Sequence, residues 1–136
     1  MRLLLLHSLP ALTIAVIAGN VILTGWALAV DLRRRRLDNS FWALLLIVLA
    51  LLVVQIASGA LLAVGGARPR RALHFLYGVL VTGVGGIQFG LRPGGFLRPT
   101  VIRDPTQFRE PLTLALLCFT QAALILRAYT TGAFGR

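Results

Sequence analysis

The fold is decided by residues 41–64, which read FWALLLIVLALLVVQIASGALLAV and hold no charged side chain. As an α-helix rising about 1.5 Å per residue, this run crosses a hydrocarbon layer about 30 Å thick. Working outward, three further runs have the same apolar character, at residues 9–30, 73–91 and 112–129. The only charged residue within the four runs is Arg127, near the end of the last. We therefore expect four transmembrane helices.

The composition supports this prediction. The chain has 136 residues, of which 57% are hydrophobic and 13% charged. Four spans and their connections use almost the whole length, which leaves no room for a second, soluble domain. The predicted fold class is therefore all-α, a polytopic membrane protein with residues 1–136 in a single domain. The connections are short enough to favour an up-down-up-down bundle.

The charge is concentrated beside the spans. The net charge is +10, and every basic residue is an arginine. Residues 31–40, the first connection, carry four in a row: Arg33, Arg34, Arg35 and Arg36. Basic segments next to spans hold loops at anionic lipid headgroups, so we expect these four to contact headgroups. We expect no nucleic-acid partner, and a multi-pass location in a bacterial cytoplasmic membrane.

The run at residues 73–91 has the clearest internal pattern. A histidine and four small residues recur at every fourth position: His74, Gly78, Thr82, Gly86 and Gly90. Residues four apart share a helix face, and a row of small residues lets another helix approach closely. We therefore expect this row to pack against a helix, and we expect Gly86→Leu to damage association or folding more than Gly132→Leu. The other interpretation is that the row clears space for a flat cofactor below His74.

The chain contains two histidines, His7 and His74. They lie near the starts of the first and third predicted helices, which run in the same direction in an alternating bundle. Both imidazoles then fall at one membrane face, and the two helices can face each other diagonally. This geometry could place them as the two axial ligands of a haem iron. The other interpretation is that both are interfacial residues with ordinary hydrogen bonds.

Polar side chains inside the spans form the remaining candidate set. The intramembrane amides are Asn20, Gln55, Gln88 and Gln121. Such groups join helices through hydrogen bonds or line a small polar site. Cys118, the only cysteine, lies in the fourth run, where we expect it to be buried.

One stretch carries a resemblance to a known family. Residues 55–78 read QIASGALLAVGGARPRRALHFLYG: a Gln and a Gly one turn apart close one helix, a short basic connection follows, and Leu-His opens the next. This resembles a helix pair of haem A synthase-type proteins, whose halves are four-helix bundles that hold haem between histidines. The resemblance covers about one sixth of the chain. It implies that His74 is an axial haem ligand. The family's Glu–His helix motif and its loop cysteines are missing.

The spans contain no carboxylate, and the sequence holds no Ser/His/Asp set, H-E-x-x-H motif or P-loop. We therefore expect a small non-enzymatic integral membrane protein, an accessory or structural subunit of a larger bioenergetic complex. Its partners would be other membrane-protein subunits or further copies of the chain. One alternative is a four-helix electron-transfer module that binds haem b through His74 and His7. A second is a small transporter or lipid-handling protein.

Overall fold

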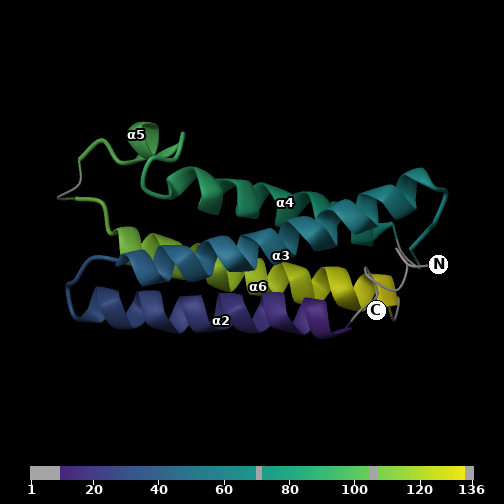
Figure 1. Cartoon of the computed structure of the whole chain (residues 1–136), viewed down its shortest axis with the longest axis horizontal. Coiled ribbons are helices and arrows are strands. Elements are labelled where there is room, and N and C mark those ends of the chain that lie inside the picture. The colour runs from purple at the N-terminus through teal and green to yellow at the C-terminus, as the bar shows by residue number, and fades with distance from the viewer. Residues whose placement is uncertain (1–9, 70–71, 105–106, 134–136) are drawn as a thin grey trace.

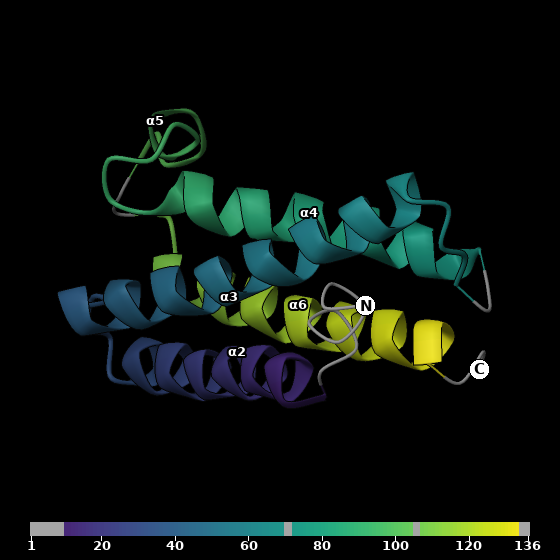
Figure 2. The same cartoon turned by 45° about the vertical axis from the view of Figure 1, so that its right-hand side comes forward.

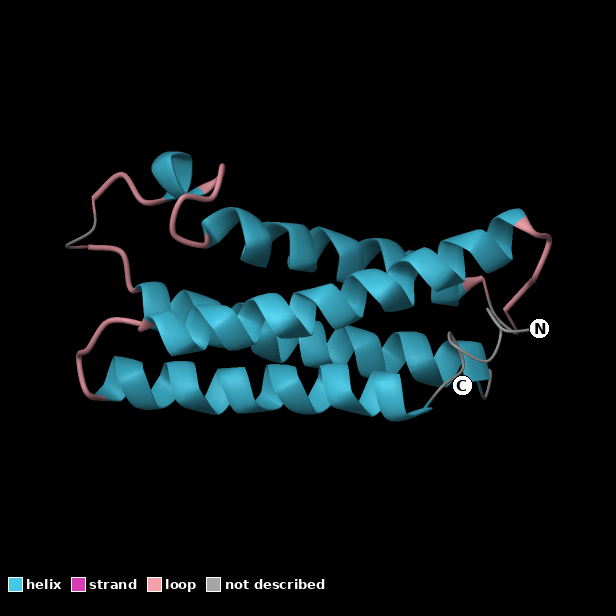
Figure 3. Ribbon diagram, viewed as in Figure 1, coloured by secondary structure: helices cyan, strands magenta, loops and turns pink. Residues whose placement is uncertain are grey.

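The computed structural model describes residues 10–69, 72–104 and 107–133. These parts consist of helices and the loops between them and contain no strand (Figure 3). The helices are α2 (Pro10–Leu32), α3 (Asn39–Val64), α4 (Leu73–Leu91), α5 (Arg98–Val101) and α6 (Glu110–Ala133). In the described part, four of them are long and apolar enough to cross a membrane, namely α2, α3, α4 and α6. The predicted all-α, four-span class is confirmed.

The four long helices alternate in direction (Figure 1). The α2–α3 connection and α5 lie at one end of the bundle, which we call the loop end, and the α3–α4 connection lies at the other. Neighbours pack in the ring order α2, α3, α4, α6, so α2 and α4 are diagonal partners, as the sequence predicts. Helix α3 runs obliquely, beside α2 at the loop end and toward α4 at the opposite end (Figures 1 and 2).

Local chemistry sets the helix ends. Helix α3 begins at Asn39, two residues before the predicted start, because the Asp38 side chain accepts a hydrogen bond from the Phe41 N–H at 3.0 Å. Helix α4 ends at Leu91 because Pro93 forces the residue before it, Arg92, into an extended conformation with ψ 159°. The structure thus matches the predicted bounds of α4 and extends those of the other spans by a few residues.

The end of α2 has an unusual residue at its turn. The Arg34 N–H donates to the Asp31 carbonyl at 2.9 Å, and the Arg35 N–H donates to the Val30 carbonyl at 3.0 Å. This pattern closes a helix through one residue in the left-handed region, usually glycine. Arg34 takes that position here with φ 51°.

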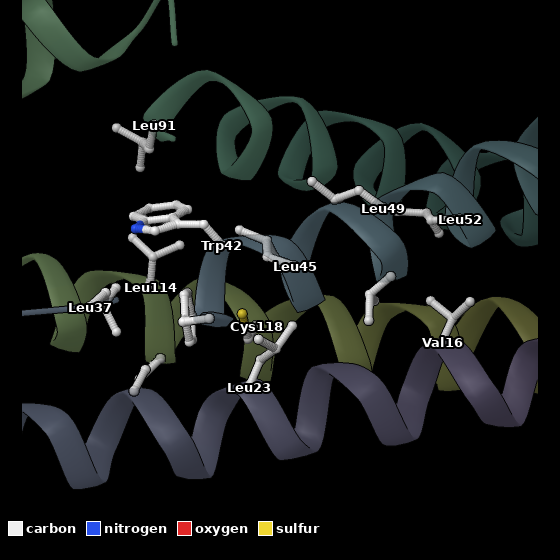
Figure 4. Close-up of a cluster of buried hydrophobic side chains, with 14 of the residues drawn as sticks. Val16, Leu23, Leu37, Trp42, Leu45, Leu49, Leu52, Leu91, Leu114 and Cys118 are labelled. Carbon is white, nitrogen blue, oxygen red and sulfur yellow. The ribbon is translucent and has the colours of Figure 1, made fainter. Parts of the chain in front are cut away.

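The interior is shared by all four spans (Figure 4). Fully buried side chains include Leu23 of α2, Leu45 of α3, and Leu114 and Cys118 of α6. Phe41 is also buried, with its ring edge-to-face against Trp26 at a centroid distance of 5.9 Å. Because lipid is as apolar as these residues, they stabilise the bundle chiefly through close packing and not through escape from water.

Ion pairs organise the chain that joins α4 to α6. An Arg98 guanidinium nitrogen, Nη1, lies 2.5 Å from the Glu110 carboxylate and 2.9 Å from the Leu91 carbonyl. Arg98 therefore links the end of α4 to the start of α6. Arg109 forms an ion pair with Asp31 and so ties the start of α6 to the end of α2.

Candidate functional site

Three of the predicted amides, Asn20, Gln88 and Gln121, are buried inside the bundle, and the first two contact each other. The Gln88 amide nitrogen lies 3.5 Å from the Asn20 oxygen and 3.3 Å from the Cys118 sulfur. The Gln121 amide nitrogen donates to the Val81 carbonyl at 3.0 Å. Together these contacts join α2, α4 and α6, including the diagonal pair α2 and α4. The amides therefore hold helices together, one of the two roles that the sequence allows.

The buried amides retain hydrogen-bonding capacity. Gln88 and Gln121 are both 0% exposed. Within the described residues, the side-chain oxygen of each has no hydrogen-bond partner. An amide oxygen accepts hydrogen bonds, so this cluster can hold a donor but has no acid, base or nucleophile beyond the Cys118 thiol.

The fourth predicted amide, Gln55, lies on α3 away from this cluster. Its side-chain nitrogen donates to the Thr13 hydroxyl of α2 at 3.3 Å. It is therefore a second interhelical link, between α2 and α3.

His74 lies at the start of α4 and faces α6. Its Nδ1 is 2.8 Å from the Ala128 carbonyl, and the ring is edge-to-face with Phe75 at 6.3 Å. If Nδ1 donates this hydrogen bond, Nε2 carries the lone pair, the tautomer that a metal ligand needs. The proposed second ligand, His7, lies outside the described residues. Haem b ligation by His74 and His7 therefore stays a prediction.

The small-residue row lies on the outer side of α4 for most of its length. A Cβ added at Gly78 or Gly86 would meet nothing within 4 Å, and Thr82 is exposed. Only Gly90 makes a close contact, with a would-be Cβ 2.7 Å from the Leu97 side chain of the following loop. The row does not open a space inside the bundle for a flat cofactor.

A different face of α4 packs inside the bundle, through Val81, Gly85 and Gln88. At Gly85 an added Cβ would lie 3.1 Å from Leu52 of α3. The polarity of Gln88 was the available signal, since a polar side chain in a membrane helix faces the protein interior. Gly85 precedes Gln88 by three residues and Val81 precedes Gly85 by four, so all three lie on one face of the helix.

For folding, the structure favours the opposite ranking of Gly86 and Gly132, whereas the expected effect of Gly86→Leu on association stays a prediction. Gly132 lies in α6, and a Cβ there would be 2.7 Å from His74 Nδ1. The same addition at Gly86 meets open space. A larger side chain at position 132 would therefore displace the His74 ring, whereas one at position 86 would displace nothing in the described part of the chain.

The four consecutive arginines, Arg33–Arg36, are all exposed at the loop end. Three of them, Arg34, Arg35 and Arg36, line a depression between the end of α2 and the start of α6, whereas Arg33 does not. Contact of these four arginines with lipid headgroups stays a prediction. No protein-family model, curated protein or solved structure matches this chain.

Proposed function

We propose that this small integral membrane protein is an accessory subunit that packs against another membrane protein through the outer face of α4. The observation that carries the proposal is the outward position of Gly78, Thr82 and Gly86. Bioenergetic complexes are the class of assembly that the sequence analysis favours.

The glycines on the outer side of α4 lower the stability of this helix. Each glycine in a helix interior costs about 1 kcal/mol relative to alanine. In the described residues, a Cβ placed at Gly78, Gly83 or Gly86 has no atom within 4 Å beyond the glycine's two chain neighbours and the adjacent backbone of α4 itself. A glycine is useful at such a position when a second helix approaches closely.

The surroundings of the row fit a helix partner. The Thr82 hydroxyl donates to the Gly78 carbonyl at 2.8 Å, so its polar hydrogen is already satisfied and an apolar neighbour is acceptable. Larger apolar side chains border the row, with Val79 69% and Phe89 42% exposed. Small residues flanked by large ones form a groove into which another helix can insert side chains.

Two substitutions test this proposal. Gly86→Leu fills the row, and Gly25→Leu is the matched control, because Gly25 is an exposed glycine of α2 whose added Cβ also meets nothing within 4 Å. Each tagged variant is isolated from its native membrane in mild detergent. We expect both variants to fold, and we expect Gly86→Leu to lose a stoichiometric partner that the wild type and Gly25→Leu retain.

Two results would count against the subunit function. One is recovery of the wild type as a lone monomer under conditions that preserve known complexes. The other is equal retention of the partner by Gly86→Leu and Gly25→Leu.

A further inference from the structure

A depression of about 720 Å³ lies at the loop end of the bundle, between the end of α2 and the start of α6. Five arginines and two carboxylates line it, which leaves a net charge of +3. A second depression of about 550 Å³ shares Arg36 and Arg98 with the first and extends the hollow along α5. The hollow lies beside the ends of the spans α2 and α6. The ends of membrane spans are where lipid headgroups are found.

Both carboxylates of the depression are already paired. Asp31 forms an ion pair with Arg109, and the Glu110 carboxylate lies 2.5 Å from Arg98 Nη1. The uncompensated charge is therefore carried by the residues 34–36, whose side chains have no hydrogen bond or ion pair with the described part of the chain. Clustered guanidinium groups bind phosphate through paired N–H donors.

The backbone of Arg34 points to a role for its side chain. Its φ of 51° makes it the one non-glycine residue with positive φ in the described chain. The other two positions with positive φ, Gly66 and Gly94, are glycines. Glycine adopts this conformation without strain, so the turn alone favours glycine at position 34. The presence of an arginine in place of glycine is explained if its guanidinium group binds a ligand. Backbone strain of this kind is found most often at functional sites.

Apolar side chains in the same depression favour a lipid over a free anion. Leu32 is 83% exposed, and Ile102 and Phe108 also contribute to the lining. A free phosphate ion has no apolar part that could cover these side chains, whereas the glycerol and first methylenes of a phospholipid would cover them. The start of α6 borders the depression, and the N-terminus of a helix carries partial positive charge that favours an anion.

We propose that this depression binds the phosphate of one anionic phospholipid, with Arg34, Arg35 and Arg36 as its ligands. The site is distinct from the outer face of α4, and it does not depend on the proposed subunit function.

Native mass spectrometry of the full chain in neutral detergent tests the proposal, with phosphatidylglycerol or phosphatidylcholine added. We expect one phosphatidylglycerol to be retained at least about tenfold better than phosphatidylcholine. Near a membrane surface, one arginine changes the affinity for anionic lipid about fivefold. Arg36→Ala should therefore weaken retention about fivefold. Arg33→Ala is the matched control, since it removes the same charge from the same loop outside the depression, and it should stay within about twofold.

Arg34→Gly separates binding from folding. Glycine adopts the left-handed conformation at this position without strain, so the thermal midpoint of Arg34→Gly in detergent should equal or exceed that of the wild type. Its retention of phosphatidylglycerol should nevertheless fall about fivefold, because one arginine is lost. Equal losses for Arg33→Ala and Arg36→Ala would overturn the proposal in favour of general loop charge. Equal retention of the two lipids would also overturn it. Displacement of phosphatidylglycerol by millimolar inorganic phosphate would show a free-anion site instead of a lipid site.

Discussion

At the scale of single residues, two neighbouring glycines of α4 have opposite surroundings. Gly85 is buried against Leu52 of α3, and Gly86 faces out of the bundle. The sequence GVGG at residues 83–86 places glycines on several faces of one helix, so the spacing of glycines alone does not identify the face that packs inside the bundle. Gln88 does select it, because its buried amide must lie with the protein interior.

Gly85→Leu should therefore destabilise the bundle by about 1–3 kcal/mol, because extra methylenes enter a packed interior. Reversible unfolding in detergent micelles measures the effect. Gly83→Leu is the control, since its added Cβ meets nothing within 4 Å, and it should fold as well as the wild type. Equal stability of the two variants would mean that Gly85 does not lie at the α3–α4 contact.

At the scale of helices, the sequence predicts the spans well because length and apolarity determine them. Helix α4 has the predicted bounds, and α6 extends from Glu110 to Ala133, beyond the predicted residues 112–129. The short helix α5 was not predicted, because its four residues depend on tertiary contacts. Arg98 supplies these by joining the Leu91 carbonyl to the Glu110 carboxylate. The amides of the interior can be identified from the sequence, but their hydrogen-bond partners cannot, since the pairing depends on how each helix is rotated about its axis.

Removal of the Arg98 side chain should loosen the α4–α6 connection. Arg98→Ala leaves the partly buried Glu110 carboxylate without its cation, and we expect a loss of about 1–2 kcal/mol in unfolding free energy. The exposed Arg103 in the same connection is the matched control, and Arg103→Ala should change stability by less than about 0.5 kcal/mol. If Arg98→Ala were as stable as Arg103→Ala, the ion pair with Glu110 would contribute nothing measurable.

At the scale of the whole molecule, the loop end, the outer side of α4 and the interior of the bundle differ in chemistry. The arginine-lined depression lies at the loop end, and the small-residue row runs along the outer side of α4. The interior amides join helices across the diagonal of the bundle. This division of surfaces suits a protein that is held by lipid at one end and by another chain along one side.

Labelling of single cysteines tests most directly whether the helices cross the membrane. Arg33→Cys and Arg68→Cys place thiols in the first and second connections, and the native Cys118 is 0% exposed and should give no background. In sealed vesicles of one orientation, a membrane-impermeant maleimide should label one position at once and the other only after permeabilisation. Labelling of both from the same side, or release of the chain by an alkaline wash, would contradict a four-span bundle.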